Sequence, residues 1–294
     1  MTAVPGRADA QQDADAQGVR MRGRLRAAIA GAGAAAPVIA VAILGVAVIT
    51  PAGHDAGRLA FRLAAASRVL PRHSAAAAHG RPFSGTPAVG ALFTTSGGHL
   101  ADHFCTASVV HSRGGDLLLT AAHCLTGKPI GRDGIVFVPA FHDGQSPYSA
   151  WRITAVFVDS AWSSRHDPDD DVAFLQAGRP GSQIEQATGA ERLGVGLPPQ
   201  QVRVIGYPDA AARPITCQAA ARGFGPRQLV FDCDGYADGT SGGPFLAQVS
   251  KSTGRGTVIG VIGGYQQGGD TPDVSYSIRF LANVAALYKT AARG

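Results

Sequence analysis

Short hydrophobic runs separated by turn residues follow one another from about residue 87 to the C-terminus. Several of these runs are rich in Val, Ile and Phe, as β-strands are. We expect strands at 105–110, 116–121, 135–141, 151–158, 171–175, 201–206, 228–231, 245–249 and 257–262. Segment 277–292 differs, because its apolar residues recur at steps of three and four, which indicates a helix. The pattern predicts an all-β barrel or sandwich that ends in one C-terminal helix.

A different hydrophobic segment lies near the N-terminus. Residues 27–49 carry no charge and follow a cluster of four arginines at positions 20, 22, 24 and 26. As a helix this run is long enough to cross a bilayer, and the arginines predict that residues 1–26 stay in the cytoplasm. A cleaved signal peptide and a retained signal anchor both fit, and Met21 is an alternative start. Both interpretations place the rest of the chain outside the cytoplasm, secreted or on the extracellular face of the membrane.

Residues 50–86 are rich in Ala, Arg, Pro and Gly and contain little that could form a core. We interpret them as a linker, with a propeptide that blocks an active site as the alternative. The predicted order is therefore a cytoplasmic basic region over 1–26, a signal or anchor helix over 27–49, this linker, and a globular domain over 87–294.

Composition and charge narrow the function. Only 16% of the residues are charged, which argues against a coiled coil or a highly charged disordered chain. Of the 26 basic residues 23 are Arg, and ten of those lie before residue 82, outside the predicted domain. No basic stripe with interleaved aromatic residues follows, so we expect no nucleic-acid partner. Membrane contact is expected only through the N-terminal segment.

The four cysteines agree with export, because an even number in an exported protein predicts disulfides. Cys105, Cys124, Cys217 and Cys233 permit three pairings, of which the local one closes two loops of similar size. A zinc site built from Cys105, Cys124 and histidines is the competing interpretation. No metal-ligand spacing supports it, and we expect no metal.

Three motifs carry the candidate chemistry. His123 ends an apolar strand in Leu-Leu-Thr-Ala-Ala-His-Cys, Asp171 lies where an acidic loop becomes an apolar strand, and Ser241 lies in Asp-Gly-Thr-Ser-Gly-Gly-Pro. Each motif has an alternative interpretation. For His123 it is a core histidine, for the run at Asp171 an acidic loop or loose Ca²⁺ site, and for the Ser241 motif a glycine-rich turn. A buried carboxylate needs a partner, which an imidazole N–H supplies. Glycines around a serine let backbone N–H groups approach a substrate.

Together these motifs resemble the trypsin-like, chymotrypsin-fold serine peptidases, in a secreted bacterial form. The order His, Asp, Ser is that family's order, and Cys105 resembles the cysteine that pairs across the histidine strand. The resemblance implies two six-stranded antiparallel β-barrels packed together. An α/β-hydrolase is set aside, because the chain has no His after His166 to follow the serine.

The resemblance also implies a mechanism. His123 takes the proton of Ser241 as the serine attacks a peptide carbonyl, and Asp171 orients the imidazole. The N–H groups of Gly239 and Ser241 bind the oxyanion of the intermediate. We expect a monomeric endopeptidase acting on proteins or peptides without a cofactor. A non-catalytic binding module on the same fold and an esterase with the same three residues are the alternatives.

Two positions depart from the family pattern. Thr240 stands before the serine where animal members usually carry an Asp that pairs with a newly cleaved N-terminus, so we expect no such activation switch. Gly235 stands where specificity for basic residues needs Asp, and the downstream wall lacks the His of glutamate-specific relatives. We expect an open pocket for apolar or medium-sized side chains, which Tyr236 and Tyr265 narrow. The predicted pocket residues are Gly235, Tyr236, Gly263, Gly264 and Tyr265.

Overall fold

The computed structural model describes residues 78–130 and 134–293. The predicted cytoplasmic region and the signal or anchor helix lie outside these residues, as does most of the predicted linker. Among the helices that the structure describes, none combines the length and hydrophobicity needed to cross a membrane.

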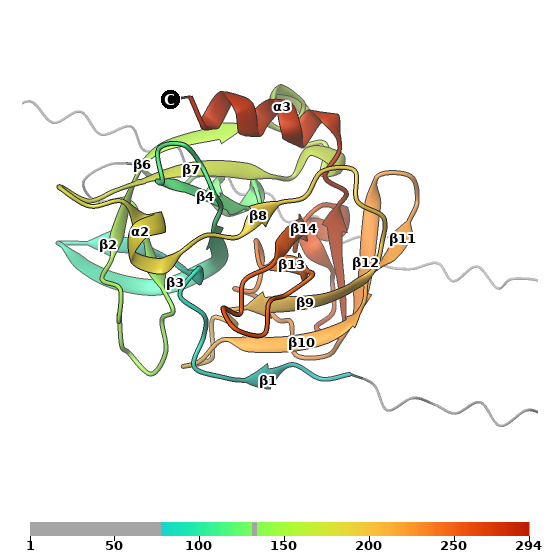
Figure 1. Ribbon diagram of the computed structural model, residues 1–294, viewed down its shortest axis with the longest axis horizontal. Helices are drawn as coiled ribbons and strands as arrows, with labels where there is room; N and C mark the ends of the chain where they lie inside the picture. The colour runs from blue at the N-terminus through green and yellow to red at the C-terminus, as the bar shows by residue number, and fades with distance from the viewer. Residues whose placement is uncertain (1–77, 131–133, 294) are drawn as a thin grey trace, which may run out of the picture. The chain divides into compact units, whose positions relative to one another are not determined.

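The N-terminal half of the described chain is a closed six-stranded barrel, at the left of Figure 1. Its strands pair antiparallel in the order β2-β3-β4-β7-β6-β5. They are β2 (Val89–Ser96), β3 (His99–Val109), β4 (Leu117–Thr120), β5 (Ile135–Pro139), β6 (Trp151–Val158) and β7 (Ala173–Gly178). The predicted barrel is confirmed here, and β6 has the predicted bounds. The pattern missed β2 and the first half of β3.

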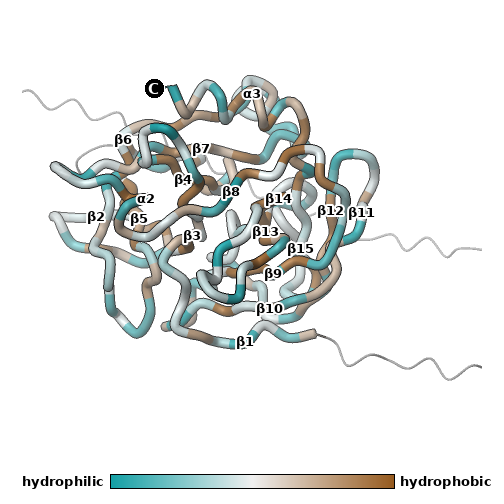
Figure 2. Tube along the Cα trace, viewed as in Figure 1, coloured by the Kyte–Doolittle hydropathy of each residue, from teal (hydrophilic) through white to brown (hydrophobic). Residues whose placement is uncertain are grey.

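Strand β4 shows why the apolar runs are nearly continuous. Successive side chains of a strand point to opposite faces. Leu118 therefore packs inside the barrel with Phe137 and Trp151. Leu117 and Leu119 face the other way, into a second buried cluster that continues into the C-terminal half. Because both faces are buried, hydrophobic colour runs along strands such as β7 and β13 in Figure 2, whereas the loop between β11 and β12 is hydrophilic.

The C-terminal half differs from the predicted second barrel. It consists of a six-stranded sheet in the order β1-β10-β9-β13-β14-β8 and a three-stranded sheet in the order β11-β12-β15, linked by a bridge between Ile262 and Ser277. Its strands are β1 (Arg81–Pro82), β8 (Arg192–Leu193), β9 (Gln201–Gly206), β10 (Ile215–Ala220), β11 (Arg222–Phe224), β12 (Gln228–Asp232), β13 (Pro244–Ala247), β14 (Thr257–Val261) and β15 (Val274–Ile278).

Two features of the six-stranded sheet depart from regular antiparallel pairing. The β13–β14 ladder shifts register between Pro244 and Leu246, where proline has no N–H to donate. Strand β8 pairs with β14 in parallel. Strand β1, which falls within the segment interpreted as a linker, pairs with β10 and so forms part of this half.

The predicted C-terminal helix is present but begins later than expected. Helix α3 spans Ala282–Ala291, because Ser277 and Ile278 belong to β15 and pair with β12. The helix crosses over to the N-terminal barrel and packs against β6 and β7 (Figure 1). The rings of Phe174 and Tyr288 lie 5.7 Å apart, and the Tyr288 hydroxyl donates to the carbonyl of His111 at 2.8 Å. The last element of the chain thus joins its two halves.

The remaining helices are short. They are α1 (Ser160–Arg165), α2 (Ile184–Thr188), and three 3₁₀ turns, η1 (His123–Leu125), η2 (Pro168–Asp170) and η3 (Tyr265–Gly268). The side chains of Asp159 and Asp167 cap α1 and η2 by accepting backbone N–H bonds. These caps shape the loop that leads to Asp171.

Candidate active site

His123 stands at the end of β4, in the first position of η1. Its side chain is mostly buried, with 13% of its surface exposed. The Nδ1–H donates to Oδ2 of Asp171 at 2.8 Å. A proton held at Nδ1 by a carboxylate leaves Nε2 of the neutral imidazole as an acceptor.

Asp171 is fully buried, as its place in the sequence predicts. Three donors satisfy its carboxylate. The backbone N–H of His123 donates to Oδ1 at 2.9 Å. The imidazole and the backbone N–H of Gly264 both donate to Oδ2, each at 2.8 Å. A buried carboxylate is stable only when it is hydrogen-bonded in this way. These bonds fix the plane of the imidazole relative to η1.

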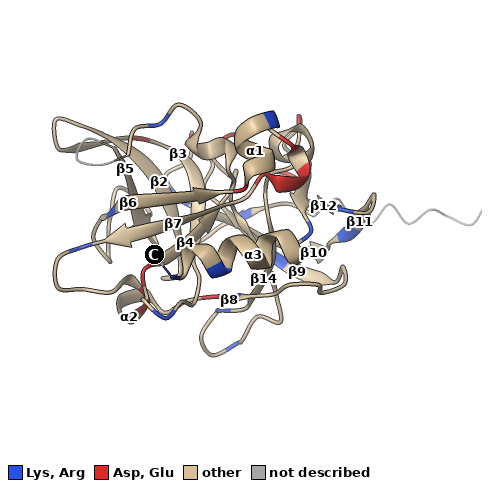
Figure 3. Cartoon of the chain, turned by 90° about the horizontal axis from the view of Figure 1, so that it is seen from above, with Lys and Arg blue, Asp and Glu red and all other residues tan. Residues whose placement is uncertain are grey.

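The other acidic residues of this run have structural partners of their own. Asp170 is also buried and accepts from Asn283 Nδ2 at 2.7 Å, with Arg227 at 3.5 Å. Asp169 accepts from Gln228 Nε2 at 2.6 Å. This acidic stretch is the red segment beside α1 in Figure 3. Asp167 caps η2, Asp169 and Asp170 share the cation of Arg227, and Asp171 binds His123, so the run does not converge on a Ca²⁺ site.

The loop before Ser241 carries two unpaired amides. Within the part of the chain that the structure describes, the backbone N–H groups of Gly239 and Ser241 have no acceptor, whereas the intervening Thr240 donates to Ala237 O at 3.2 Å. Gly239 has φ +89°, and a Cβ there would lie 2.5 Å from Tyr207 O and from Asp209 N. Glycine is therefore required at this position.

The side chain of Thr240 stabilises the same loop. It is buried, and its hydroxyl donates to the carbonyl of Ala237 at 2.7 Å. The residue before Ser241 is thus a neutral side chain that has its partner inside the loop.

His123 and Ser241 line one cavity of about 830 Å³, together with the Cys105–Cys124 disulfide. One wall is the loop 236–241 and another is the loop 266–272. In the described residues, no hydrogen bond joins the Ser241 hydroxyl to the imidazole. Such bonds are often long in ligand-free enzymes and tighten when substrate binds.

The predicted pocket residues lie in different places. Tyr236 lines this cavity, with its hydroxyl donating to Val204 O at 2.9 Å, and Gly264 lines a neighbouring cavity of about 390 Å³ on another side of His123. Gly235, Gly263 and Tyr265 line neither of these two cavities. Gly263 lies against the catalytic candidate instead, since a Cβ there would be 3.0 Å from Oδ2 of Asp171.

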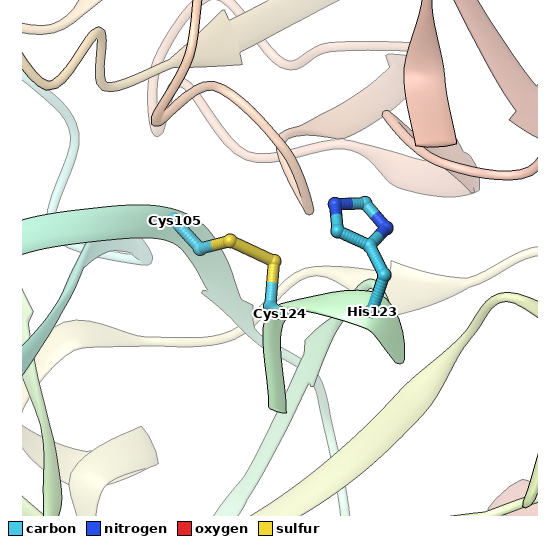
Figure 4. A group of neighbouring side chains, drawn as sticks. All are labelled: Cys105, His123 and Cys124. Atoms are coloured by element: carbon cyan, nitrogen blue, oxygen red, sulfur yellow. A yellow bond between two sulfur atoms is a disulfide. The ribbon is translucent and has the colours of Figure 1, made fainter. Parts of the chain in front are cut away.

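Both disulfides are the local ones, Cys105–Cys124 and Cys217–Cys233. Figure 4 shows the first of them beside His123. Within residues 78–130 and 134–293, one group of at least three His, Cys, Asp or Glu side chains lies close enough together to hold a metal. It consists of Cys105, His123 and Cys124. Because both sulfur atoms are joined to each other, neither is available as the thiolate that zinc requires.

Comparison with known proteins identifies the family. The model of the trypsin-like peptidase domain matches residues 105–261, a span from the first cysteine to the end of β14. The chain belongs to the trypsin-like peptidases. This span contains the histidine, aspartate and serine motifs and more than half of the chain.

Solved structures of other peptidases share the fold. Protease Anisep from Arthrobacter nicotinovorans has a TM-score of 0.61 at 23% identity, covering 73% of this chain and all of its own. The thermostable serine protease AL20 from an extremophilic microorganism has a TM-score of 0.60 at 25% identity, covering 71% of this chain and 98% of its own. A Glu endopeptidase has a TM-score of 0.56 at 14% identity, covering 74% of this chain and 98% of its own. No curated protein matches in a sequence search. The peptidase has a chymotrypsin-like fold. Its family and these solved structures identify it as a serine endopeptidase.

Sequence reasoning missed Gln228 and Thr106 as contributors to the site of this peptidase, and it gave Gly264 a different role. Gly264 was expected in the pocket, but its N–H holds Asp171 across 93 positions of sequence. The Gln228 side chain links the acidic loop to η3 by accepting from the Tyr265 N–H at 3.3 Å and donating to Asp169. Thr106 contacts the Ser241 loop directly. No local pattern marks these residues, because each acts on a segment far away in the sequence.

Proposed function

We propose that the peptidase cleaves peptide bonds through His123, Asp171 and Ser241. Ser241 Oγ attacks the carbonyl carbon while its proton moves to Nε2 of His123. The imidazolium then gives this proton to the leaving amine, and an ester of Ser241 remains. Water hydrolyses the ester by the same route, returning the proton to the serine.

The hydrogen bond from His123 Nδ1–H to buried Asp171, in a cavity that Ser241 also lines, is the observation that carries this proposal. The carboxylate favours the tautomer in which Nε2 is free to accept, and it stabilises the imidazolium when that forms. The backbone N–H groups of His123 and Gly264 also donate to this carboxylate and hold it in place.

The unpaired N–H groups of Gly239 and Ser241 support an oxyanion hole. Both amides lack an acceptor among the described residues, and they flank the candidate nucleophile. Donors that are oriented before the reaction stabilise the negative oxygen without reorganisation, which is usually the largest electrostatic contribution to acyl transfer.

We propose that the substrate side chain beside Ser241 is apolar or of medium size. The carboxylates at the cavity, Asp209, Asp238 and Asp270, are exposed, so no buried charge in its lining selects a cation. Tyr236 and Ile262 give it buried apolar surface. The substrate is a protein or peptide, as the family implies.

We propose further that the enzyme acts outside the cytoplasm, either secreted or on the extracellular face of the membrane. Two disulfides are compatible with an oxidising compartment. The segment that decides between release and anchoring, 27–49, lies outside the described residues.

Labelling of the full-length exported chain with a fluorophosphonate, combined with cleavage profiling on a mixed peptide library, tests the proposal. We expect the wild-type chain to be labelled and to cleave, and Ser241→Ala to lose both properties. Ser182→Ala, at an exposed serine away from both cavities, serves as the matched control and keeps both. A folded wild-type chain that takes up no label would favour a binding module. A labelled chain that hydrolyses esters but no peptides would favour an esterase.

A further inference from the structure

Thr106 connects the two halves of the molecule at the loop that carries Ser241. It follows Cys105 on β3 of the N-terminal barrel and is completely buried. The loop belongs to the C-terminal half, between β12 and β13. Thr106 does not line the cavity that His123 and Ser241 share, so it does not contact a peptide bound there.

Three hydrogen bonds join Thr106 to the C-terminal half. Its backbone N–H donates to Ser241 O at 2.7 Å. Its hydroxyl donates to Gly239 O at 3.0 Å and accepts from the backbone N–H of Tyr207 at 2.9 Å. The direction of these bonds is unambiguous, because an amide can only donate and a carbonyl can only accept.

These contacts alternate with the two unpaired amides. Gly239 and Ser241 each present an N–H that has no acceptor in the part of the chain that the structure describes, and each has its carbonyl bound to Thr106. The N–H and C=O of one residue are related only by its φ and ψ angles. Gly239 has the widest choice of these angles because it lacks a Cβ. Among the described residues, only the Thr106 side chain binds the Gly239 carbonyl, whereas the Thr106 backbone binds the Ser241 carbonyl.

We propose that the Thr106 hydroxyl is a positioning group for the oxyanion hole: by fixing the Gly239 carbonyl, it keeps the Gly239 N–H directed at the developing oxyanion. This inference rests on the proposed function of Ser241 and deepens it. The hydroxyl acts through Gly239 and does not touch the reacting atoms. Its loss therefore weakens binding of the transition state rather than of the substrate.

Thr106→Val removes the hydroxyl while keeping the shape of the side chain, and it leaves the backbone bond to Ser241 intact. We expect kcat to fall by about tenfold or more, since loss of a whole oxyanion donor costs about a hundredfold to a thousandfold. KM should change by less than about twofold. Affinity for a peptide aldehyde, which forms a hemiacetal with Ser241, should fall in proportion to kcat/KM. Thr106→Ser restores the hydroxyl and should recover most of the loss.

Thr188→Val is the matched control. Thr188 is also buried, its hydroxyl is bonded to the backbone of Ile184 and Gly189, and it lies in α2 away from the cavity. We expect this variant to lose stability without losing kcat. If Thr106→Val does not fold, Thr106→Ala, which leaves room for a water molecule, provides the same comparison.

Several outcomes would overturn the inference. These are an unchanged kcat in Thr106→Val, an equal loss of kcat in Thr188→Val, a loss confined to KM, and a lack of recovery in Thr106→Ser. Each requires an active wild-type chain in which Ser241 is labelled. An unlabelled and inactive wild-type chain overturns the proposed function itself, so the two failures are distinguished by the wild-type measurement alone.

Discussion

Adjacent aspartates in the acidic run have different roles, which shows how much is decided at the residue scale. Asp170 and Asp171 are both buried, but Asp171 binds His123 and Asp170 binds Asn283 and Arg227. The 3₁₀ turn η2 separates their directions. Sequence identified Asp171 as the residue drawn inward, but it did not foresee a second buried carboxylate beside it.

Asp171→Asn tests the role of the carboxylate while keeping its size. An amide can no longer stabilise the imidazolium, and it favours the wrong tautomer of His123, so we expect kcat to fall by about three to four orders of magnitude. Asp170→Asn is the neighbouring control and should lower stability but leave kcat near wild type. Steady-state kinetics on one peptide substrate measures both, and equal losses in the two variants would contradict the assignment.

At the scale of elements, the strands were easier to predict than their boundaries and partners. The runs at 151–158 and 201–206 match β6 and β9, because apolar residues between turn residues define them locally. Strand β10 was missed because the polar residues Thr216 and Gln218 interrupt its apolar run. Register, bulges and the parallel pairing of β8 depend on distant strands, which local patterns do not specify.

The two disulfides link comparable loops but different functional elements. Cys105–Cys124 joins β3 to η1 across 19 positions, and Cys217–Cys233 joins β10 to the residue after β12 across 16. Replacing either pair by serine should lower the free energy of unfolding by about 3 kcal/mol. Only Cys105→Ser with Cys124→Ser should also lower kcat, because Cys124 neighbours His123 in η1. Urea denaturation and kinetics on both double variants test this, and unchanged kcat in the first pair would contradict it.

At the scale of the whole molecule, buried Glu191 lies where the chain crosses between the two halves. Its backbone pairs with Val109 and His111 beside the N-terminal barrel, and its Oε2 accepts from Gly256 N–H in the C-terminal half. Among the described residues Oε1 has no hydrogen-bond partner. Burial raises the pKa of Glu191 from 4.5 to about 7, against the opposing effects of the Gly256 hydrogen bond and of Arg255 and Arg203.

This raised pKa predicts that stability falls as pH rises. The folded protein keeps the Glu191 proton up to about pH 7, whereas the unfolded chain loses it near 4.5. The stabilisation is therefore complete below about pH 4.5 and is lost as the pH rises to about 7, by an amount of about 3 kcal/mol. Urea denaturation of Glu191→Gln at pH 5 and pH 8 should show a smaller difference than wild type. Asp102→Asn, at an exposed carboxylate, should behave like wild type, and an unchanged difference in Glu191→Gln would contradict the prediction.

The sequence by itself determined the three chemical motifs, the β-rich class of the fold and the resemblance to the family, because these depend on residue types within short segments. Only the tertiary structure decided which N–H groups hold Asp171, how Thr106 binds the Ser241 loop, and that the C-terminal strands form two sheets. Those features join segments tens to more than a hundred residues apart. Hydrogen bonds and packing at that range depend on how whole strands fit together, which no local pattern of residues encodes.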